Sequence, residues 1–180
     1  ALAAVHHNTG RLIDYVLWDP ISDPVTQEVI RHGDTMGCFY VESPATRLLL
    51  KKLWTTMPQA RREHADVFEY LVAVSSIIRP AANVYADEFV RRSHGHPYRS
   101  WHPLLDEVLD ETHGIMVYQE DVMKVAVALG GFSVHDGDQL RKVLSKKHKE
   151  RQLRDYQRQF YAGAAVRHIS RPVVDHVWAM

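Results

Sequence analysis

The chain has 180 residues, of which 46% are hydrophobic, and its formal net charge is zero, so it is long and apolar enough to bury a sizeable core. No apolar run reaches the eighteen residues of a membrane span, and residues 1–7 lack the pattern of a signal peptide, so we expect neither membrane insertion nor secretion. The single cysteine, Cys38, excludes an internal disulfide, argues against a structural zinc site and fits the reducing cytoplasm, where we expect the protein.

Hydrophobic periodicity predicts helices through the first half of the chain. Residues 46–54 carry leucines at helical spacing. Residues 67–78 are apolar on most sides, as in a buried helix, and Arg79-Pro80 ends that helix because the residue before a proline avoids helical geometry. A short helix is expected near residues 84–92.

Helices dominate the second half as well. Pro103 is placed to open a helix and Gly114 to stop it, and residues 115–129 form another apolar helix, with a short extended entry at residues 115–117 as an alternative. Strand signal is limited to residues 36–42 and 115–117. We therefore predict a mainly α fold with little or no strand.

A basic helix is expected next. Ser133 and Asp136 have the spacing of a capping box, with Asp in place of the usual Glu, and one or two long helices are expected from Asp138 onward. On this interpretation Arg141 and Lys142 lie one turn inside the N-terminal end of a helix that follows a glycine-rich turn.

Charge is divided unevenly along the chain. Residues 141–171 hold ten Lys and Arg against two acidic residues, whereas residues 1–140 hold twelve against nineteen. The net charges are about +8 and about −7, which favours one surface that meets a polyanion. A basic helix that is simply solvated remains an equal alternative.

The basic segment is the best candidate for binding. Arg141 and Lys142 could neutralise a triphosphate, because Arg makes forked contacts with phosphate oxygens and Lys supplies a mobile charge. Four further residues could hold a nucleic-acid backbone independently of base sequence: Lys146, Lys147, Lys149 and Arg151.

A self-contained active site is not apparent. The sequence has neither a glycine-rich phosphate loop nor a nucleophile elbow. His94, His96 and His102 invite a metal hypothesis, but their spacing is not diagnostic. We predict no catalytic and no metal-binding residue. The remaining acidic cluster has the pattern of a solvated helix face: Asp106, Glu107, Asp110 and Glu111.

Several motifs, taken in order, resemble the fingers region of bacterial C-family DNA polymerases, the group that includes the DNA polymerase III alpha subunit. Residues 33–43 are similar to the family's "GDTxGxFxxES" segment, and residues 76–80 to the helix end "RPGP". Residues 102–123 are similar to "HP…ETYGVxVYQEQVM". Residues 131–147 and 160–164 are similar to "GYS…ADxLRRAMGKK" and to the "FxxGA" that follows it.

The resemblance implies a role in DNA synthesis. The family's fingers close over the incoming deoxynucleoside triphosphate, so the parent protein would be a DNA-directed DNA polymerase, a nucleotidyltransferase. Arg141 and Lys142 match the basic pair that contacts the phosphates, and Arg79 matches the arginine of "RPGP" in the same region. A helix-end residue that bonds carbonyls is an equal alternative for Arg79.

The resemblance also divides the chain and assigns partners. Residues 1–32 would follow the palm, and residues 33–180 would be a helical fingers region, truncated at both ends relative to the parent. The family's Mg²⁺-binding aspartates belong to the palm and have no counterpart here, so we expect the fragment alone to be inactive. Expected partners are primer-template DNA, dNTP and, through other regions, further replisome subunits.

Three departures from the family pattern affect the predicted contacts. Ala81-Ala82 replaces Gly-Pro, Lys142 replaces the second Arg of the basic pair, and Ser145 replaces a Gly. Two alternatives stay open: a non-catalytic helical module that binds nucleic acid or protein and shares ancestry with polymerases, and a metal-dependent hydrolase that uses the histidines. The motifs fit both replicative and error-prone polymerases.

Overall fold

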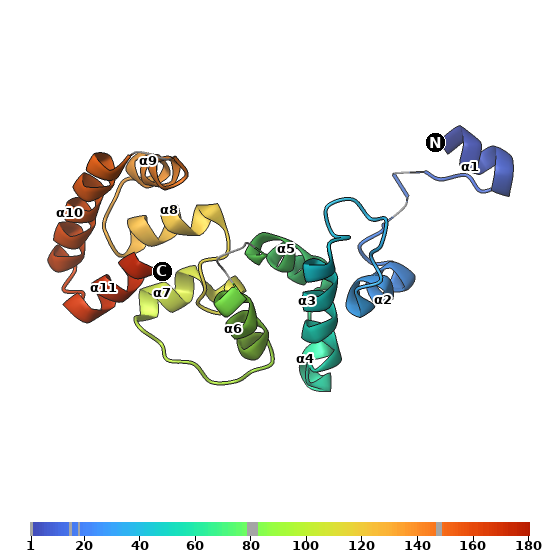
Figure 1. Cartoon of the computed structure of the whole chain (residues 1–180), viewed down its shortest axis with the longest axis horizontal. Helices are drawn as coiled ribbons and strands as arrows, with labels where there is room; N and C mark the ends of the chain where they lie inside the picture. Colours follow the sequence, from blue (N-terminus) through green and yellow to red (C-terminus); the bar gives the residue numbers. More distant parts are fainter. Residues whose placement is uncertain (1, 15, 18, 79–82, 147–148) are drawn as a thin grey trace. The chain divides into compact units, whose positions relative to one another are not determined.

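The computed structural model describes residues 2–14, 16–17, 19–78, 83–146 and 149–180 (Figure 1). Within these ranges the chain forms eleven α-helices and one short 3-10 helix, without any strand. The expectation of a mainly α fold is confirmed. The two segments with strand signal, residues 36–42 and 115–117, are irregular, in agreement with the expectation of little or no strand.

Local hydrogen bonds explain both irregular segments. The Thr35 hydroxyl donates to the carbonyl of Val41 at 2.6 Å, and Gly37 and Tyr40 adopt φ values of 80° and 72°, so the chain folds back on itself instead of extending. In the other segment the backbone N–H of Val117 donates to the carboxylate of Asp121 at 3.0 Å rather than to a neighbouring strand.

The chain divides into two compact units, Ala1–Val72 and Ala73–Met180, and the division falls inside α5 (Val67–Ile77). These units are defined by packing. The expected boundary between residues 32 and 33 concerns the palm and fingers of a polymerase and stays a prediction.

Proline and a capping side chain start the two main helices of the first unit. Asp23 accepts a hydrogen bond from the backbone of Thr26 at 2.6 Å, and Ser43 accepts one from the backbone of Thr46 at 3.2 Å. The unit contains α1 (Leu2–Thr9), α2 (Pro24–His32), α3 (Pro44–Thr55), α4 (Gln59–Arg62) and the start of α5. The helix expected at residues 46–54 lies within α3.

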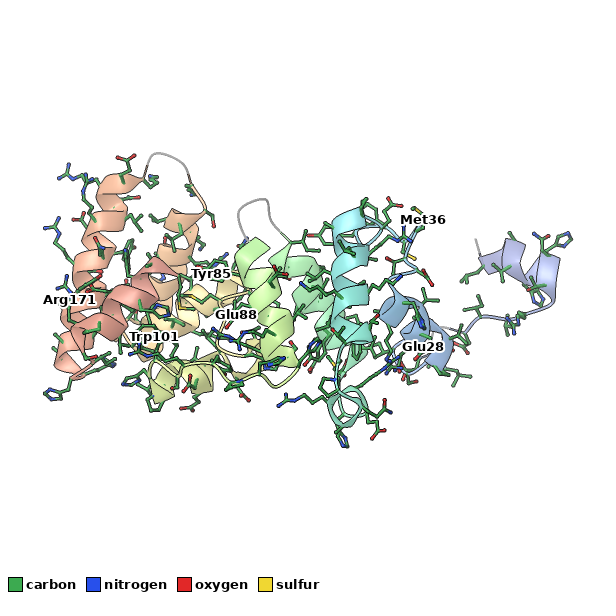
Figure 2. The ribbon with its side chains drawn as sticks, turned by 60° about the horizontal axis from the view of Figure 1, so that its bottom comes forward. Glu28, Met36, Tyr85, Glu88, Trp101 and Arg171 are labelled. Carbon is green, nitrogen blue, oxygen red and sulfur yellow. The ribbon has the colours of Figure 1, made fainter. Side chains whose placement is uncertain are left out.

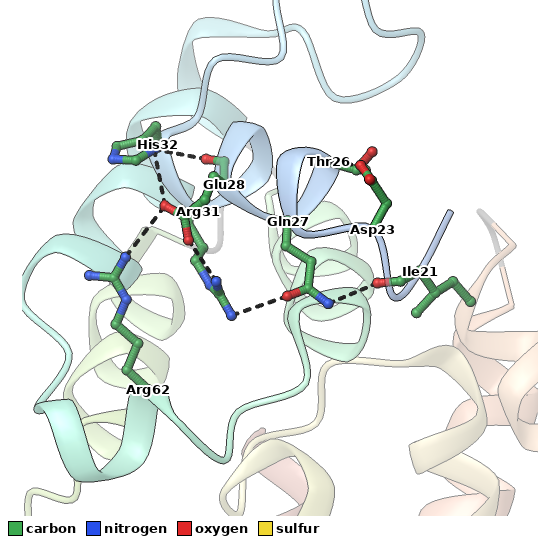
Figure 3. A network of polar contacts seen from close by, with 8 residues as sticks. All are labelled: Ile21, Asp23, Thr26, Gln27, Glu28, Arg31, His32 and Arg62. Atoms are coloured by element: carbon green, nitrogen blue, oxygen red, sulfur yellow. Dashed lines mark hydrogen bonds and ion pairs between the residues drawn. The ribbon is translucent and has the colours of Figure 1, made fainter. Parts of the chain in front are cut away.

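A polar network around Glu28 joins α2 to α4 (Figure 3). Arg31 donates to the Glu28 carboxylate at 2.7 Å, and the guanidinium of Arg62 lies 3.8 Å from it. The hydrogen bond from Arg31 lowers the pKa of Glu28 most, with smaller contributions from the charges of Arg31, Arg62 and His32. The short helix α4 is therefore attached to α2 by charge as well as by the chain.

The second unit holds the segments that carry the predicted binding residues. Residues 84–92, expected as a helix, lie within α6 (Asn83–Ser93). The helix expected from residue 115 begins only at Gln119, because Asp121 bonds the N–H groups of Val117 and Tyr118 and so caps that end. The other elements are α7 (Pro103–Val108), the 3-10 helix Asp110–Thr112, α8 (Gln119–Ala128), α9 (Val134–Leu144), α10 (Glu150–Val166) and α11 (Arg171–Ala179).

Two glycines allow α10 to pack closely against the end of α8. A Cβ on Gly163 would overlap the carbonyl oxygen of Gly130, and a Cβ on Gly130 would overlap the ring of Phe160. The connection that follows α8 thus runs directly along α10. This contact borders the hydrophobic core of the unit, which contains Leu105, Leu109, Val125, Leu129, Phe160, Ala164, Ile169, Val173, Val174 and Val177.

Glu88 of α6 should contribute measurably to the stability of the second unit. Its carboxylate accepts bonds from Arg91 at 2.7 Å and Arg92 at 2.6 Å; the bond from Arg91 has the largest effect on its pKa, which lies at about 2 against an ordinary 4.5. Because the folded pKa is lowered, this stabilisation is complete above pH 4.5 and is lost as the pH falls towards 2.

We expect Glu88→Gln to lower the free energy of unfolding by about 2 kcal/mol at pH 7, a value reduced for the partial exposure of Arg91. Urea denaturation followed by circular dichroism measures it, and the difference from the unsubstituted chain should shrink below pH 4.5. Glu107→Gln, at an exposed position, is the control. A difference that is constant between pH 7 and pH 3 would contradict the role of the ion pair.

Candidate nucleotide-binding site and nucleic-acid interface

The start of α9 decides where the basic pair lies. The Ser133 hydroxyl accepts a hydrogen bond from the backbone N–H of Asp136 at 3.1 Å and donates one to its carboxylate at 2.6 Å, so Ser133 caps the helix, but the reciprocal bond of a capping box, from the Ser133 backbone N–H to Asp136, is not formed. The helix therefore begins at Val134, and Arg141 and Lys142 occupy its last turn. Their expected place near the N-terminal end was wrong.

This position changes the electrostatics. The C-terminal end of a helix carries partial negative charge, which stabilises cations there. The backbone N–H groups at the other end of α9 are too far along the helix to assist a phosphate bound by this pair. Any binding of phosphate must come from the two side chains themselves.

One carboxylate holds both cations. Asp138 bonds Arg141 at 2.8 Å and Lys142 at 2.6 Å, which are the i, i+3 and i, i+4 neighbours on the helix. The hydrogen bond from Lys142 lowers the pKa of Asp138 most, followed by that from Arg141. The three residues together carry a net charge of about +1, so Asp138 does not neutralise the basic pair completely.

Gln119 of α8 supplies a second anchor for Arg141. The Nη1 group of Arg141 donates to its side-chain oxygen at 3.2 Å, while Nε and Nη2 donate to Asp138 at 3.0 and 2.8 Å. A guanidinium has five N–H donors, and these bonds use three. Two donors therefore stay unbonded among the described residues, on a group whose orientation is fixed.

Arg141 lines a cavity of about 580 Å³ between α8, α9, α10 and the end of α11. Gln119, Arg141 and Ser145 supply polar atoms to its lining. Its other walls are largely apolar and include Val122, Leu140, Leu153, Phe160 and Trp178. A cavity of this size with a few polar groups at one side is typical of ligand sites.

The predicted backbone-binding residues lie next to this site along the chain. Lys146 follows α9, Lys149 precedes α10, and Arg151 lies in the first turn of α10. All three are exposed, and none has an ion-pair partner in the described part of the chain. Lys147 and Arg79 were also predicted to bind, and both lie outside the described residues.

Further residues of the backbone-binding surface, and the partners of Arg141, were not predicted from the sequence. Arg154 and Arg158 continue the exposed face of α10 three and seven residues after Arg151, a periodic signal that was available. Asp138 could have been found from its spacing to Arg141. Gln119 could not, because the contact joins residues 22 positions apart.

The histidine hypothesis finds no support in the described residues, where no group of three or more potential metal ligands occurs. The Nδ1 atom of His102 instead accepts a hydrogen bond from the backbone of Leu104 at 3.2 Å and caps α7. Across the part of the chain that the structure describes, no helix is long and apolar enough to cross a bilayer.

Comparison with known proteins gives a family match over most of the chain. Residues 1–168 match the family described as the bacterial DNA polymerase III alpha subunit finger domain. The chain belongs to this family. The resemblance inferred from the motifs is confirmed.

Relatives of the finger domain include both replicative and error-prone polymerases. The DNA polymerase III subunit alpha of Neisseria meningitidis serogroup B is 35% identical over 97% of this chain, and that of Chlamydia pneumoniae is 35% identical over 82%. An error-prone DNA polymerase of Symbiobacterium thermophilum is 32% identical over 89%. The chain spans only 11% to 14% of the length of these relatives.

Proposed function

We propose that this finger domain is part of a DNA-directed DNA polymerase, a cytoplasmic enzyme of DNA replication, in which it positions the triphosphate of the incoming dNTP and the primer-template. The observation that carries the proposal is the guanidinium of Arg141. Gln119 and Asp138 fix its orientation beside a cavity that Arg141 lines, and two of its N–H donors stay available among the described residues.

The chemistry of nucleotidyl transfer gives this arrangement a purpose. When the primer 3′-hydroxyl attacks the α-phosphorus, negative charge accumulates on the departing pyrophosphate. Oriented donors that meet this charge lower the barrier because they need no rearrangement during the reaction. Arg141 would supply the forked contact. Lys142 would supply a mobile charge, and its ammonium group would move away from Asp138 when the triphosphate binds.

The rest of the reaction belongs to other parts of the polymerase. Two Mg²⁺ ions, held by palm aspartates, would activate the primer hydroxyl and the leaving group. The chain alone would then be inactive, and Arg79 would line the triphosphate region as the family motif implies. Contacts with other replisome subunits would lie outside this domain.

The direct test replaces Arg141 with alanine in the full-length polymerase that carries this domain and measures kcat and KM for a single dNTP. A fall in kcat/KM supports the proposal, and an unchanged value removes Arg141 from the nucleotide site. Binding of dNTP to the 180-residue chain gives a second readout that does not depend on catalysis.

The salt dependence of DNA binding tests the interface at residues 146–151. We expect alanine at Lys146, Lys149 and Arg151 to reduce the slope of log Kobs against log[salt] by about 2 to 3, because each contacted phosphate contributes about 0.9. Fluorescence anisotropy with a labelled primer-template duplex measures this, and the loss should be the same for unrelated DNA sequences.

A matched variant controls for total charge. Alanine at Arg11, Lys51 and Arg61 removes three exposed positive charges from the first unit and should leave the slope nearly unchanged. Equal slopes for the two triple variants would mean that net charge, rather than this surface, governs DNA binding.

A further inference from the structure

A second cavity in the Ala73–Met180 unit has a lining that the proposed nucleotide site does not use. It encloses about 520 Å³ between α6, the loop of residues 94–102, α7 and the end of α11. Figure 2 shows three of the residues that line it, Tyr85 and Glu88 on α6 and Trp101 on the loop. Among the residues that the structure describes, only Met180 lines both this cavity and the one beside Arg141.

Pairs of aromatic rings and arginines build its wall. The guanidinium carbon of Arg92 lies 4.1 Å from the centre of the Tyr98 ring, and that of Arg99 lies 4.0 Å from the Trp101 ring. Trp101 in turn stacks on His176, with ring centres 3.8 Å apart and an interplanar angle of 16°. Stacking restricts each of these groups before any ligand arrives.

Hydrogen bonds hold the loop against its neighbours as well. Arg91 donates to the carbonyl of Pro97 at 2.9 Å, and Arg92 donates to that of His113 at 2.7 Å. Gly114 has a φ of 77°, and a Cβ there would lie 3.1 Å from both Arg92 and Tyr98. The wall formed by Tyr98 therefore depends on a glycine that fits this backbone and leaves room for the ring.

The charged side chains of the lining balance, with Arg91, Arg92 and Arg99 against Asp87, Glu88 and Asp106, and one of the arginines has no ion-pair partner among the described residues. Glu88 is bonded by both Arg91 and Arg92. Arg99 is exposed and has no ion-pair partner among the residues described, yet its stack on Trp101 fixes its plane. A stacked guanidinium keeps its in-plane N–H groups free, which suits forked contacts with a phosphate.

This lining matches one nucleotide unit. Tyr85 and Tyr98 are 39% and 38% exposed and offer aromatic surface to a base, and the buried Leu105 and Ile115 also line the cavity. Base-aromatic stacking combined with an arginine on the backbone is how proteins hold single strands without reading sequence. A base inside a duplex could not enter such a cavity, because it would first have to leave its pair.

We propose that this cavity binds one unpaired nucleotide of single-stranded DNA, with Arg99 on its phosphate and Tyr85 and Tyr98 against its base. The choice of DNA as the occupant rests on the proposed function, whereas the residues are independent of the dNTP site. The template strand is unpaired beyond the primer end, so a domain of a polymerase lies near single-stranded DNA.

Titration of the 180-residue chain with oligo(dT) of about five nucleotides tests the proposal. The indole N–H resonance of Trp101, assigned with Trp101→Phe, should shift, and a blunt duplex should not shift it. We expect Arg99→Ala and Tyr85→Ala to weaken oligo(dT) binding about tenfold and about fivefold, as measured by anisotropy. Arg61→Ala, which removes an exposed arginine from the other unit, should have no effect.

The outcomes separate this proposal from the dNTP site. Alanine at Arg141 should weaken dNTP binding and leave the Trp101 shift unchanged, so failure of either site is visible by itself. An unshifted Trp101 resonance, or full oligo(dT) affinity in Arg99→Ala, would overturn the proposal. Displacement of oligo(dT) by a short polyglutamate at equal concentration would also overturn it, because the site would then select charge and not a base.

Discussion

Replacing Arg141 with alanine should lower kcat/KM for dNTP incorporation about 100-fold in the polymerase that carries this domain, which corresponds to about 2.7 kcal/mol. The two N–H donors left by Gln119 and Asp138 would be lost together with the charge. Each charge-assisted hydrogen bond contributes about 1.5 to 3 kcal/mol. Because charge on the pyrophosphate grows during the reaction, we expect kcat to fall as well as KM to rise.

Three further variants show whether the fork or the charge matters. Arg141→Lys keeps the charge and loses the fork, so it should recover only about tenfold of the loss. Gln119→Ala should produce a smaller fall, and it should add nothing once Arg141 is absent, because it acts only by orienting the guanidinium. Arg61→Ala is the control for charge and should change neither parameter.

The measurement also has a clear contrary result. Single-nucleotide incorporation, followed over a range of dNTP concentrations, separates kcat from KM. If Gln119→Ala and Arg141→Ala were additive, Gln119 would have a role apart from Arg141. If Arg141→Ala neither raised the KM for dNTP nor lowered kcat, the triphosphate would be bound by other residues.

Helices were predictable from the sequence where periodicity and capping residues agree. Residues 46–54 lie within α3 because its leucine spacing, the proline at its start and the Ser43 cap act locally, and residues 84–92 lie within α6. Helix starts were harder to predict. The helix expected from residue 115 starts at Gln119, because the buried Asp121 accepts hydrogen bonds from the backbone N–H groups of Val117 and Tyr118, which precede the helix.

The basic pair illustrates how a small error in a boundary alters a mechanism. The capping motif at Ser133 was recognised, yet Arg141 and Lys142 were placed near the N-terminal end of their helix, and α9 begins early enough to put them in its last turn. A phosphate there receives no help from the helix N-terminus. The side chains must therefore be oriented by partners, and Gln119 and Asp138 provide this.

Contacts between distant residues set the limit of prediction from sequence. The spacing of Asp138 to Arg141 and Lys142 was a local signal, whereas the bond of Gln119 to Arg141 depends on how α8 packs against α9. The stack of Trp101 on His176 joins the loop after α6 to α11. Neither pair has a sequence pattern, because side chains meet there only after the helices have packed.

Gly163→Ala should destabilise the second unit by about 3 kcal/mol, although alanine favours a helix over glycine by about 1 kcal/mol. The added methyl group would overlap the carbonyl oxygen of Gly130, a backbone atom that cannot rotate away. Relief requires α10 to move, and Phe160 and Leu153 on that helix line the cavity beside Arg141. We therefore expect weaker dNTP binding at temperatures where the chain is still folded.

Gly137→Ala in α9 is the matched control, since its added methyl group would lie 3.0 Å from the Met123 side chain and 3.3 Å from the Met123 carbonyl oxygen, contacts far less severe than the overlap at Gly163. Its free energy of unfolding should change by less than about 1 kcal/mol, because the clash and the helix propensity nearly cancel. Urea denaturation compares the two variants, and dNTP titration in the folded range reports on the cavity. If Gly163→Ala were as stable as Gly137→Ala, α10 would have room to shift, and close packing at Gly130 would not be what places the cavity wall.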